Sequence, residues 1–157
     1  MTERSVEHDQ FSIEKRYDFP PGMVFRAWAD PAAKRRWFAE TEGFTDIEYG
    51  LDFRVGGTET CSGRHPAAGR FTYDAVIQDI VENDRIVLAY RMTMDGTPIS
   101  VSLATVTFEA AGAATRLTNT EQAAFLDGLD NAKPRRTGVA WQLEHLAREL
   151  QNATAGA

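Results

Sequence analysis

The C-terminal part of the sequence carries one apolar stripe at helical spacing. Four apolar residues recur at i, i+4, i+7 and i+11: Val139, Leu143, Leu146 and Leu150. This spacing predicts a single amphipathic helix from about residue 131 to about residue 151. Full burial of each of these side chains would contribute about 1.5–3 kcal/mol. A stripe along a helix of about 30 Å must lie on a large apolar surface, and the rest of the chain offers only a sheet for this role.

Between residues 44 and 122 the sequence alternates strand patterns with turn signals. Asn83-Asp84 is a turn pair, and Asp95-Gly96 is a strong hairpin signal. Consecutive strands that are joined this tightly pair in antiparallel order, so we expect an antiparallel meander of about six strands.

A first strand and two short helices precede this meander. Apolar and polar residues alternate over residues 11–19, which is typical of a half-buried strand. Pro20-Pro21 ends that strand and opens a first helix. Asp30-Pro31 supplies an N-cap and a first-turn proline for a second short helix.

One helix cannot cover a flat sheet of this width, so we expect the sheet to curl around the C-terminal helix. The alternating stretch 51–55 predicts a strand, and we interpret the Gly56-Gly57 pair after it as a bend with a bulge at positive φ. The predicted fold class is α+β, a curved antiparallel β-sheet wrapped around a long C-terminal helix. We expect a single domain over residues 8–152 and a flexible polar tail over residues 153–157.

Composition and charge exclude several classes of function. The 157 residues carry a net charge of −6, which argues against nucleic-acid binding. No run approaches the about 20 apolar residues of a membrane span, and the first residues lack the apolar segment of a secretory signal. Cys61 is the only cysteine, so an internal disulfide is excluded and a cytoplasmic location is expected. The one basic cluster, Lys133 to Arg136, is interpreted as a solvated helix start rather than a phosphate site.

Curling also predicts a cavity, because a curved sheet that grips a helix leaves space between the two. Its walls are predicted from three sets of residues. They are the residues of each strand that face inward by alternation, two tryptophans of the short helices, and the apolar face of the long helix. The residues predicted to line this cavity and to bind a ligand there are Trp28, Trp37, Phe71, Tyr73, Tyr90, Met92, Leu117, Asn119, Glu121, Val139 and Leu143. A pocket of this composition is typical of a small-molecule site.

The polar members of this set admit two interpretations. Asn119 and Glu121 share the inner parity of Leu117, because Arg116, Thr118, Thr120 and Gln122 form a polar outer face. A buried carboxylate without partners is costly. Asn119 and Glu121 therefore either reach water at the end of the sheet or act as polar anchors in an apolar pocket.

Two further positions need structural explanations. Gly138 lies inside the predicted helix, where it costs about 1 kcal/mol against alanine. Close approach of helix and strand, or a helix that begins at Thr137, is the favoured explanation, and room for a ligand is the alternative. In the strand over residues 99–109, the apolar residues are odd-numbered up to Leu103 and even-numbered from Val106. A bulge near Ala104 would let both sets face the same side of the sheet.

Several motifs in fixed order point to a family. They are Val24 to Trp28 followed by Asp30-Pro31, the run Asp52 to Gly57, and Trp141 in the last helix. Together they resemble the bacterial proteins similar to the activator of Hsp90 ATPase, within the START-like (SRPBCC, Bet v 1-like) superfamily. The resemblance covers nearly the whole chain and implies the helix-grip fold, with a cavity between the sheet and the C-terminal helix. Superfamily members include lipid and hormone binders, polyketide cyclases and co-chaperones, so the fold does not fix the function.

No catalytic constellation is visible in the sequence. Cys61 and His65 have a Cys-x₃-His spacing, but a zinc site needs two more ligands. His145 and Glu149 are i, i+4 neighbours and are predicted to form a surface pair. We therefore expect no catalytic residue, no metal and no cofactor.

Three functions remain, and non-catalytic binding of a small hydrophobic or amphipathic ligand ranks first. The second is a polyketide cyclase- or hydrolase-like enzyme that uses Asn119, Glu121, Tyr73 or Tyr90. The third is a co-chaperone-like protein-interaction module, although the sequence is expected to lack the separate N-terminal domain with which the eukaryotic activator binds Hsp90. An open apolar pocket would favour ligand binding, and a filled interior would favour the protein-interaction module. A polar cluster in the pocket with a shifted carboxyl pKa would favour the enzyme. The expected partner is a small molecule, with a homodimer left open.

Overall fold

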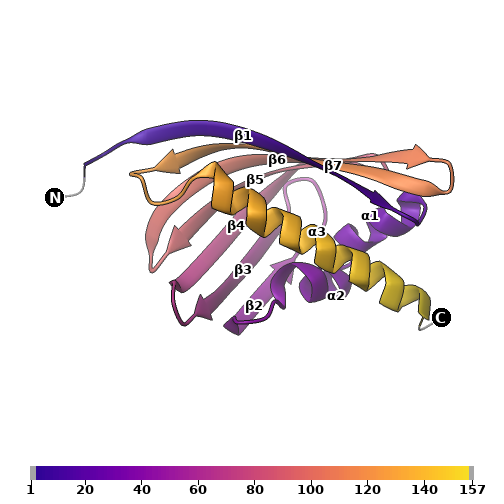
Figure 1. Cartoon of the computed structure of the whole chain (residues 1–157), viewed down its shortest axis with the longest axis horizontal. Helices are drawn as coiled ribbons and strands as arrows, with labels where there is room; N and C mark the ends of the chain where they lie inside the picture. The colour runs from indigo at the N-terminus through magenta and orange to yellow at the C-terminus, as the bar shows by residue number, and fades with distance from the viewer. Residues whose placement is uncertain (1–2, 156–157) are drawn as a thin grey trace.

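The structure is a computed structural model that describes residues 3–155. Its elements are β1 (Val6–Tyr17), α1 (Pro21–Ala29), α2 (Pro31–Lys34), a π-helical turn η1 (Arg35–Ala39), β2 (Thr45–Leu51), β3 (Thr58–His65), β4 (Gly69–Val81), β5 (Arg85–Met94), β6 (Thr97–Ala111), β7 (Ala114–Leu126) and α3 (Ala132–Ala155). The strands form one seven-stranded antiparallel sheet in the order β1-β7-β6-β5-β4-β3-β2, and α3 crosses its concave side (Figure 1). The predicted α+β helix-grip fold is confirmed.

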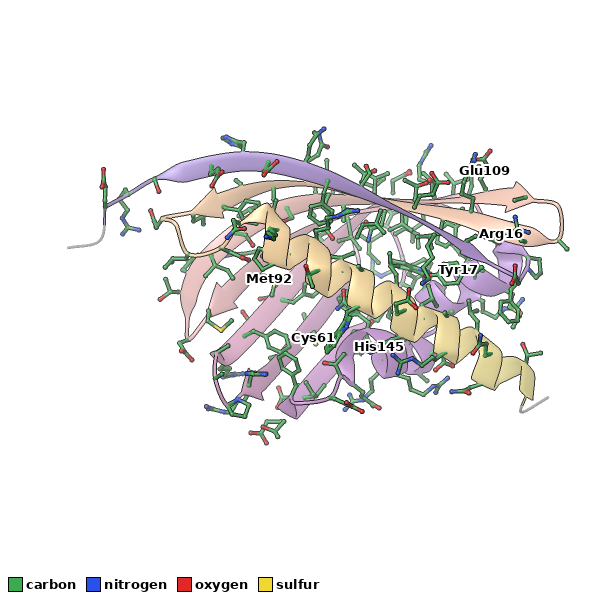
Figure 2. All side chains as sticks on the ribbon, viewed as in Figure 1. Arg16, Tyr17, Cys61, Met92, Glu109 and His145 are labelled. Carbon is green, nitrogen blue, oxygen red and sulfur yellow. The ribbon has the colours of Figure 1, made fainter. Side chains whose placement is uncertain are left out.

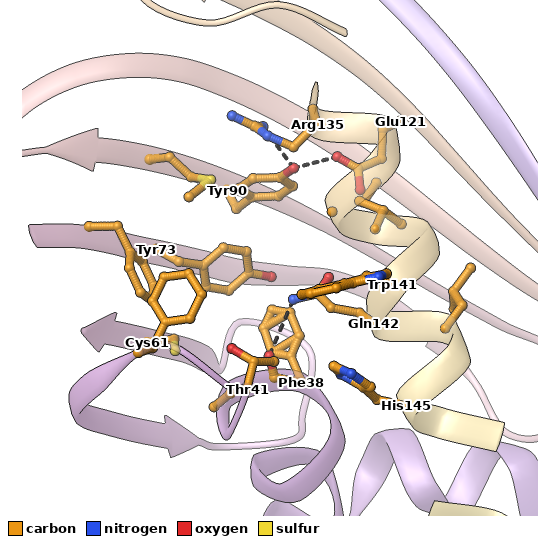
Figure 3. A pocket seen from close by; sticks show the side chains of 18 of the residues that line it. Phe38, Thr41, Cys61, Tyr73, Tyr90, Glu121, Arg135, Trp141, Gln142 and His145 are labelled. Carbon is orange, nitrogen blue, oxygen red and sulfur yellow. Dashed lines mark hydrogen bonds between the residues drawn. The ribbon is translucent and has the colours of Figure 1, made fainter. Parts of the chain in front are cut away.

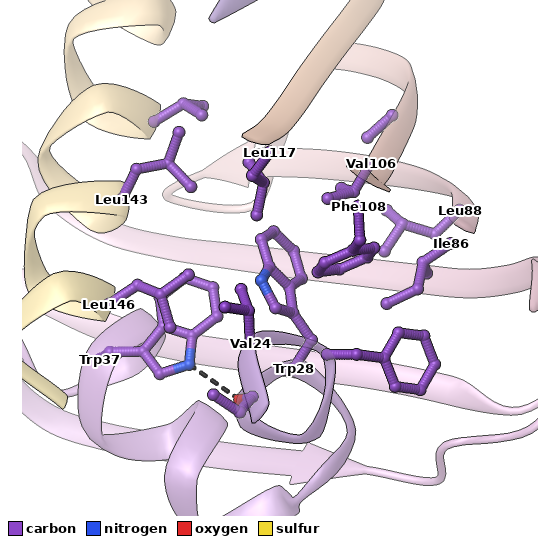
Figure 4. Packing of buried hydrophobic residues seen from close by; sticks show 14 of the residues in the cluster. Val24, Trp28, Trp37, Ile86, Leu88, Val106, Phe108, Leu117, Leu143 and Leu146 are labelled. Carbon is purple, nitrogen blue, oxygen red and sulfur yellow. Dashed lines mark hydrogen bonds between the residues drawn. The ribbon is translucent and has the colours of Figure 1, made fainter. Parts of the chain in front are cut away.

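The apolar stripe of α3 is buried as its spacing predicts. Leu143, Leu146 and Leu150 are 1%, 0% and 2% exposed, and they share one core with the tryptophans of α1 and η1 (Figure 4). The hydroxyl of Tyr17 at the end of β1 donates a hydrogen bond to the carbonyl of Leu143 at 2.8 Å. The first strand is thereby tied to the last helix, and both sit on the same core.

The strands of the sheet bend at register shifts. Gln78 is an extra residue in β4 relative to β5, and Ile99 is an extra residue in β6 relative to β5. Such bulges increase the local twist and bend of a strand. The bulge predicted near Ala104 is wrong in position. Beyond Ile99 the even-numbered residues of β6 face inward, and Val101 and Leu103 are 49% and 40% exposed.

The Gly56-Gly57 pair lies in the connection between β2 and β3, not inside a strand. The predicted strand over residues 51–55 is wrong beyond Leu51, and Val55 is 57% exposed. The connection folds back onto β4. The amide of Gly56 donates to the carbonyl of Ile77 at 2.8 Å, and the amide of Ile77 donates to the carbonyl of Gly57 at 2.9 Å. Within the pair, Gly56 has a positive φ of +83° and Gly57 does not, so the expected bulge at positive φ is wrong at Gly57 and the positive φ of Gly56 shapes a turn.

Replacing Gly57 with alanine is expected to lower the free energy of unfolding by about 1–3 kcal/mol. An added Cβ would lie 2.1 Å from the carbonyl oxygen of Asp52 and 2.9 Å from that of Arg54, so the backbone of the turn would have to move. Gly22→Ala is the matched control, because its Cβ would meet only the side chain of Asn83, at 3.7 Å. Urea denaturation compares the two variants, and a Gly57→Ala protein as stable as the control would contradict this account of the turn.

The C-terminal helix is longer than the apolar stripe predicts. It continues to Ala155, so the first residues of the tail predicted from residue 153 are helical, and residues 156–157 lie outside the described part of the chain. Among residues 3–155, no helix combines the length and the hydropathy that crossing a membrane requires.

Candidate functional site

A cavity of about 620 Å³ lies between the concave face of the sheet and α3, with α2 and η1 along one side (Figure 3). Cys61 and Met92 reach it from strands, and His145 reaches it from α3 (Figure 2). Ten of the eleven residues predicted to line it do so: Trp28, Trp37, Phe71, Tyr73, Tyr90, Met92, Asn119, Glu121, Val139 and Leu143. Leu117 does not, because it is 0% exposed in the adjoining core (Figure 4). The role of these residues in binding stays a prediction.

Gly138 leaves space on the cavity side of α3. A Cβ added at Gly138 would meet nothing within 4 Å, and α3 begins at Ala132. Close approach of helix and strand is therefore wrong as an explanation of this glycine, and so is a helix start at Thr137. Room beside the helix is the explanation that remains. One turn further on, Trp141 also lines the cavity while being 59% exposed, so it lies where the cavity opens to solvent.

Aromatic rings make up much of the cavity wall. The rings of Tyr73 and Tyr90, from neighbouring strands, have their centroids 4.8 Å apart. Phe38 of η1 packs edge-on against Tyr73 with a centroid distance of 5.1 Å. Trp28 and Trp37 pack edge-on at 4.8 Å, and the indole nitrogen of Trp37 donates to the carbonyl of Ala27 at 2.9 Å (Figure 4). These contacts hold the rings in fixed positions around the space.

One polar cluster lies at the β7 and α3 side of the cavity. The hydroxyl of Tyr90 donates to the carboxylate of Glu121 and accepts from the guanidinium of Arg135 at 3.0 Å (Figure 3). Glu121 is 4% exposed and Asn119, two residues earlier on the same face of β7, is 5% exposed. Burial raises the pKa of the Glu121 carboxyl, while the hydrogen bond from Tyr90 and the charge of Arg135 lower it by less. The interpretation that Asn119 and Glu121 lie in water at the end of the sheet is wrong.

Arg135 is the residue of this cluster that sequence reasoning missed. It is 9% exposed, although the basic cluster at residues 133–136 predicts a solvated helix start. Its guanidinium donates to Asp130 at 2.6 Å and to the hydroxyls of Ser100 at 2.8 Å and Ser102 at 3.4 Å. The signal that could have found it is the alternation of Ser100 and Ser102 with the apolar residues of β6.

A second polar cluster, the Lys34–Glu59 pair, lies in the aromatic wall. The ammonium of Lys34 donates to the carboxylate of Glu59 at 2.8 Å, and the two residues are 3% and 1% exposed. Glu59 also accepts from the hydroxyls of Tyr49 and, at 3.0 Å, Tyr73. Burial and then the charge of Glu59 raise the pKa of Tyr73 well above its usual value, so its hydroxyl remains a donor.

The ammonium of Lys34 is also enclosed by aromatic rings. It lies 4.4 Å from the ring centroid of Phe38 and 4.6 Å from that of Trp28. Such cation–π contacts compensate part of the hydration that a buried ammonium loses. No local pattern in the sequence distinguishes Lys34 from the two arginines that follow it, because its partner Glu59 lies 25 residues away.

Three buried polar atoms have no hydrogen-bond partner within residues 3–155: Trp28 Nε1, Asn119 Oδ1 and His145 Nδ1. All three belong to residues that line the cavity. Buried polar groups in folded proteins are almost always hydrogen-bonded, so each such exception needs an explanation. The atoms themselves have almost no accessible surface, so a molecule in the cavity would contact these side chains without reaching the three atoms.

The sulfur and imidazole groups do not assemble a nucleophile or a metal centre in the described part of the chain. Burial raises the pKa of the Cys61 thiol to about 12, and a thiol is a poor nucleophile and metal ligand. No group of three or more His, Cys, Asp or Glu side chains among residues 3–155 is placed to hold a metal ion. The predicted surface pair of His145 and Glu149 is wrong, because Glu149 accepts from Arg36 at 2.7 and 3.0 Å.

The sequence profile of the family described as activator of Hsp90 ATPase homolog 1-like protein matches residues 18–153. The chain belongs to this family. A protein from Rhizobium leguminosarum is 43% identical, with a TM-score of 0.91, and the match covers 96% of this chain and 99% of that one. The protein Mll3558 from Rhizobium loti is 46% identical, with a TM-score of 0.85 and coverage of 92% and 99%.

More distant structures share the fold of the activator of Hsp90 ATPase homolog 1-like family. An AHSA1-like protein from Aeromonas hydrophila is 18% identical over 93% of this chain and 94% of that one, with a TM-score of 0.70. A comparison with curated protein sequences found no match. Family membership is consistent with the START-like superfamily and supports a ligand-binding domain.

Proposed function

We propose that this protein binds a small apolar or amphipathic molecule, without chemical change, in the cavity between the sheet and α3. The observation that carries the proposal is a cavity of about 620 Å³ whose wall includes the packed rings of Tyr73, Tyr90 and Phe38. This volume lies in the range of drug-sized ligand sites. A concave, largely aromatic and apolar wall with a few polar side chains is typical of a site for an apolar or amphipathic ligand.

The test places a larger side chain at Gly138, a position of α3 that lines the cavity and leaves space beside it. Gly138→Leu is expected to weaken binding of the neutral fluorophore N-phenyl-1-naphthylamine at least about tenfold, because the added side chain occupies the volume beside α3. Gly138→Ala is the matched control, expected to bind as the wild type does and to be more stable by up to about 1 kcal/mol, since alanine is the better helix former. Fluorescence titration measures binding and urea denaturation measures stability. Equal affinity of all three proteins would contradict binding at this cavity.

Native mass spectrometry of protein purified from its own host tests the proposal independently. We expect a retained small molecule that is released on denaturation and is depleted in Gly138→Leu. Protein that carries no molecule and binds no apolar probe would contradict the proposal.

A second candidate function is an enzyme that uses Glu121 for proton transfer. The observation in its favour is a buried carboxyl with a raised pKa, hydrogen-bonded to Tyr90 inside the cavity, which is a common property of catalytic acids and bases. Incubation of the retained molecule with fresh protein separates the candidates. Recovery at unchanged mass and chromatographic retention supports binding, whereas conversion by wild-type protein but not by Glu121→Gln supports the enzyme.

The remaining alternatives have weaker support. A protein-interaction module was expected to have a filled interior, and a cavity of about 620 Å³ does not match that expectation. We further propose a cytoplasmic location, on the ground that the only cysteine is a free thiol.

A further inference from the structure

Two tyrosines on neighbouring strands each donate a hydrogen bond to a buried carboxylate beside the cavity. Tyr73 of β4 donates to Glu59 at 3.0 Å, and Tyr90 of β5 donates to Glu121. The two glutamates are 1% and 4% exposed. A carboxylate removed from water is costly unless a cation or several donors replace its lost hydration. Both glutamates therefore need a cation, and within residues 3–155 only Glu59 forms an ion pair.

At Glu59 the chain supplies its own ammonium. Lys34 donates to Glu59 at 2.8 Å. The nitrogen of Lys34 also lies 4.4 Å from the ring centroid of Phe38 and 4.6 Å from that of Trp28. A carboxylate, tyrosine hydroxyls and aromatic rings together thus hold one ammonium out of water in this fold.

At Glu121 no side chain of the described residues supplies an ammonium. One carboxyl oxygen, Oε1, accepts from Tyr90, and the other, Oε2, accepts no hydrogen bond within residues 3–155 (Figure 3). Asn119 Oδ1, two residues earlier on β7, is closed off from its surroundings, but Glu121 Oε2 is not. Because Glu121 lines the cavity, its second oxygen is an acceptor that a bound molecule can reach.

Arg135 is a buried cation in the same cluster, but it is bonded to a different carboxylate. Its guanidinium donates to Asp130 at 2.6 Å and is linked to Glu121 only through the hydroxyl of Tyr90, which accepts from it at 3.0 Å. The other donors that it directs into the cluster go to serine hydroxyls of β6. The charge of Arg135 therefore compensates Glu121 only in part.

The charged side chains around the cavity leave one negative charge over. When the histidines are counted as neutral, two cations face three carboxylates: Lys34 and Arg135 against Glu59, Asp130 and Glu121. Burial raises the pKa of the Glu121 carboxyl, and a positive charge at hydrogen-bond distance would favour its ionised form. An uncharged donor would fill the open acceptor but leave the carboxylate without a cation. A carboxylate or phosphate would add a second uncompensated charge.

From the comparison of the two glutamates we infer that the ligand is a cationic amphiphile, a molecule with an apolar body and one protonated amine that pairs with Glu121. This inference rests on the proposed binding function and adds the charge of the ligand. The ammonium donates to Oε2 of Glu121 beside the ring of Tyr90, as Lys34 donates to its carboxylate beside the ring of Phe38. The apolar body packs against the aromatic wall that includes Tyr73.

Three probes with one biphenyl body and different head groups test the inference. They are 4-phenylbenzylamine, 4-phenylbenzyl alcohol and biphenyl-4-carboxylate, each titrated at neutral pH against the wild-type protein by displacement of N-phenyl-1-naphthylamine. The amine and the alcohol have nearly the same size, so their comparison isolates the positive charge. The amine is expected to bind at least about tenfold more tightly than the alcohol, the size of one charge-assisted hydrogen bond. The carboxylate is expected to bind more weakly than the alcohol.

Variants assign this preference to Glu121. Glu121→Gln removes the charge but keeps an oxygen that can accept from Tyr90, and it is expected to reduce the amine-to-alcohol ratio from about ten to about one. Glu144→Gln is the matched control, because it removes the same charge from an exposed position of α3 that pairs with Lys15. This control is expected to keep the wild-type ratio. The comparison of probes on the wild-type protein stands whether or not Glu121→Gln folds.

The outcomes separate the inference from the proposed function. An alcohol that binds as tightly as the amine, or tightest binding of the carboxylate, overturns the cationic ligand and leaves cavity binding intact. An amine preference that survives in Glu121→Gln overturns the role of Glu121. Failure of every probe and of the fluorophore to bind the wild-type protein contradicts the proposed function itself.

Discussion

Replacing Lys34 with methionine is expected to lower the free energy of unfolding by about 3–5 kcal/mol, the usual cost of breaking a buried ion pair from one side. The loss of stability comes from the buried carboxylate of Glu59, which the substitution leaves without a cation. Glu59 is 1% exposed and would keep a carboxylate whose only ion-pair partner in the described chain, Lys34 at 2.8 Å, has gone. The hydrogen bonds that Tyr49 and Tyr73 donate to Glu59 cannot replace a full charge.

The neighbouring residue provides the control. Arg35 also forms an ion pair at 2.8 Å, with Glu40, but their side chains are 40% and 49% exposed. Arg35→Met should therefore cost about 1 kcal/mol or less. In urea denaturation the double variant Lys34→Met/Glu59→Gln should recover most of the loss, because it removes the unpaired charge and keeps an acceptor for the tyrosines. Equal losses for Lys34→Met and Arg35→Met would contradict the account of the pair.

The inward-facing side chains of the site could be predicted where hairpins are tight and strands regular. The alternation of β4, β5 and β7 placed Tyr73, Tyr90, Asn119 and Glu121 on the inner face, and they all line the cavity. The period of a strand is two, so one anchored apolar residue fixes the direction of its neighbours as long as no residue is inserted. The same logic on a helix placed Leu143 correctly.

Insertions explain where the prediction went wrong. The extra residue Ile99 reverses the parity of β6, so Val101 and Leu103 face solvent. Ser100 and Ser102, which alternate with them, accept hydrogen bonds from Arg135. The prediction assumed that the apolar residues of a strand face inward. The outer face of this sheet also carries apolar side chains, among them Val101 and Leu103. A bulge leaves no reliable mark in the sequence, because it depends on the pairing of two strands.

Buried charges could not be predicted for a different reason. Lys34 and Arg135 each sit in a basic run that is typical of a solvated helix, and their partners come from other elements. A cation can be buried only where a carboxylate, hydroxyls or aromatic rings of other elements contact it. The site therefore contains inner-face residues that a pattern predicts and charged residues that only the assembled structure reveals.

Arg135→Met is expected to lower the free energy of unfolding by about 3 kcal/mol, since it removes one partner from a buried charged network. The guanidinium joins the first turn of α3 to β5 and β6 through hydrogen bonds to Tyr90 at 3.0 Å and Ser100 at 2.8 Å. Without it, Asp130 would lose its ion-pair partner and the hydroxyl of Tyr90 would lose a donor. Hydrogen exchange should become faster in the first turns of α3, because this network is what holds them to the sheet.

Two further variants in the first turn of α3 test whether stability depends on the hydrogen-bond geometry of Arg135 or only on its charge. Arg136→Met is the matched control: Arg136 is exposed and donates one hydrogen bond, to the carbonyl of Ser12 at 3.2 Å, so its loss should change stability by about 0.5 kcal/mol or less. Arg135→Lys keeps the charge but cannot reach hydroxyls on two strands and the Asp130 carboxylate at once, because an ammonium lacks the planar fork of a guanidinium. It should therefore recover only part of the lost stability. Full recovery by lysine would mean that the charge alone holds α3 against the sheet, and that the hydrogen bonds of Arg135 do not position Tyr90 beside Glu121.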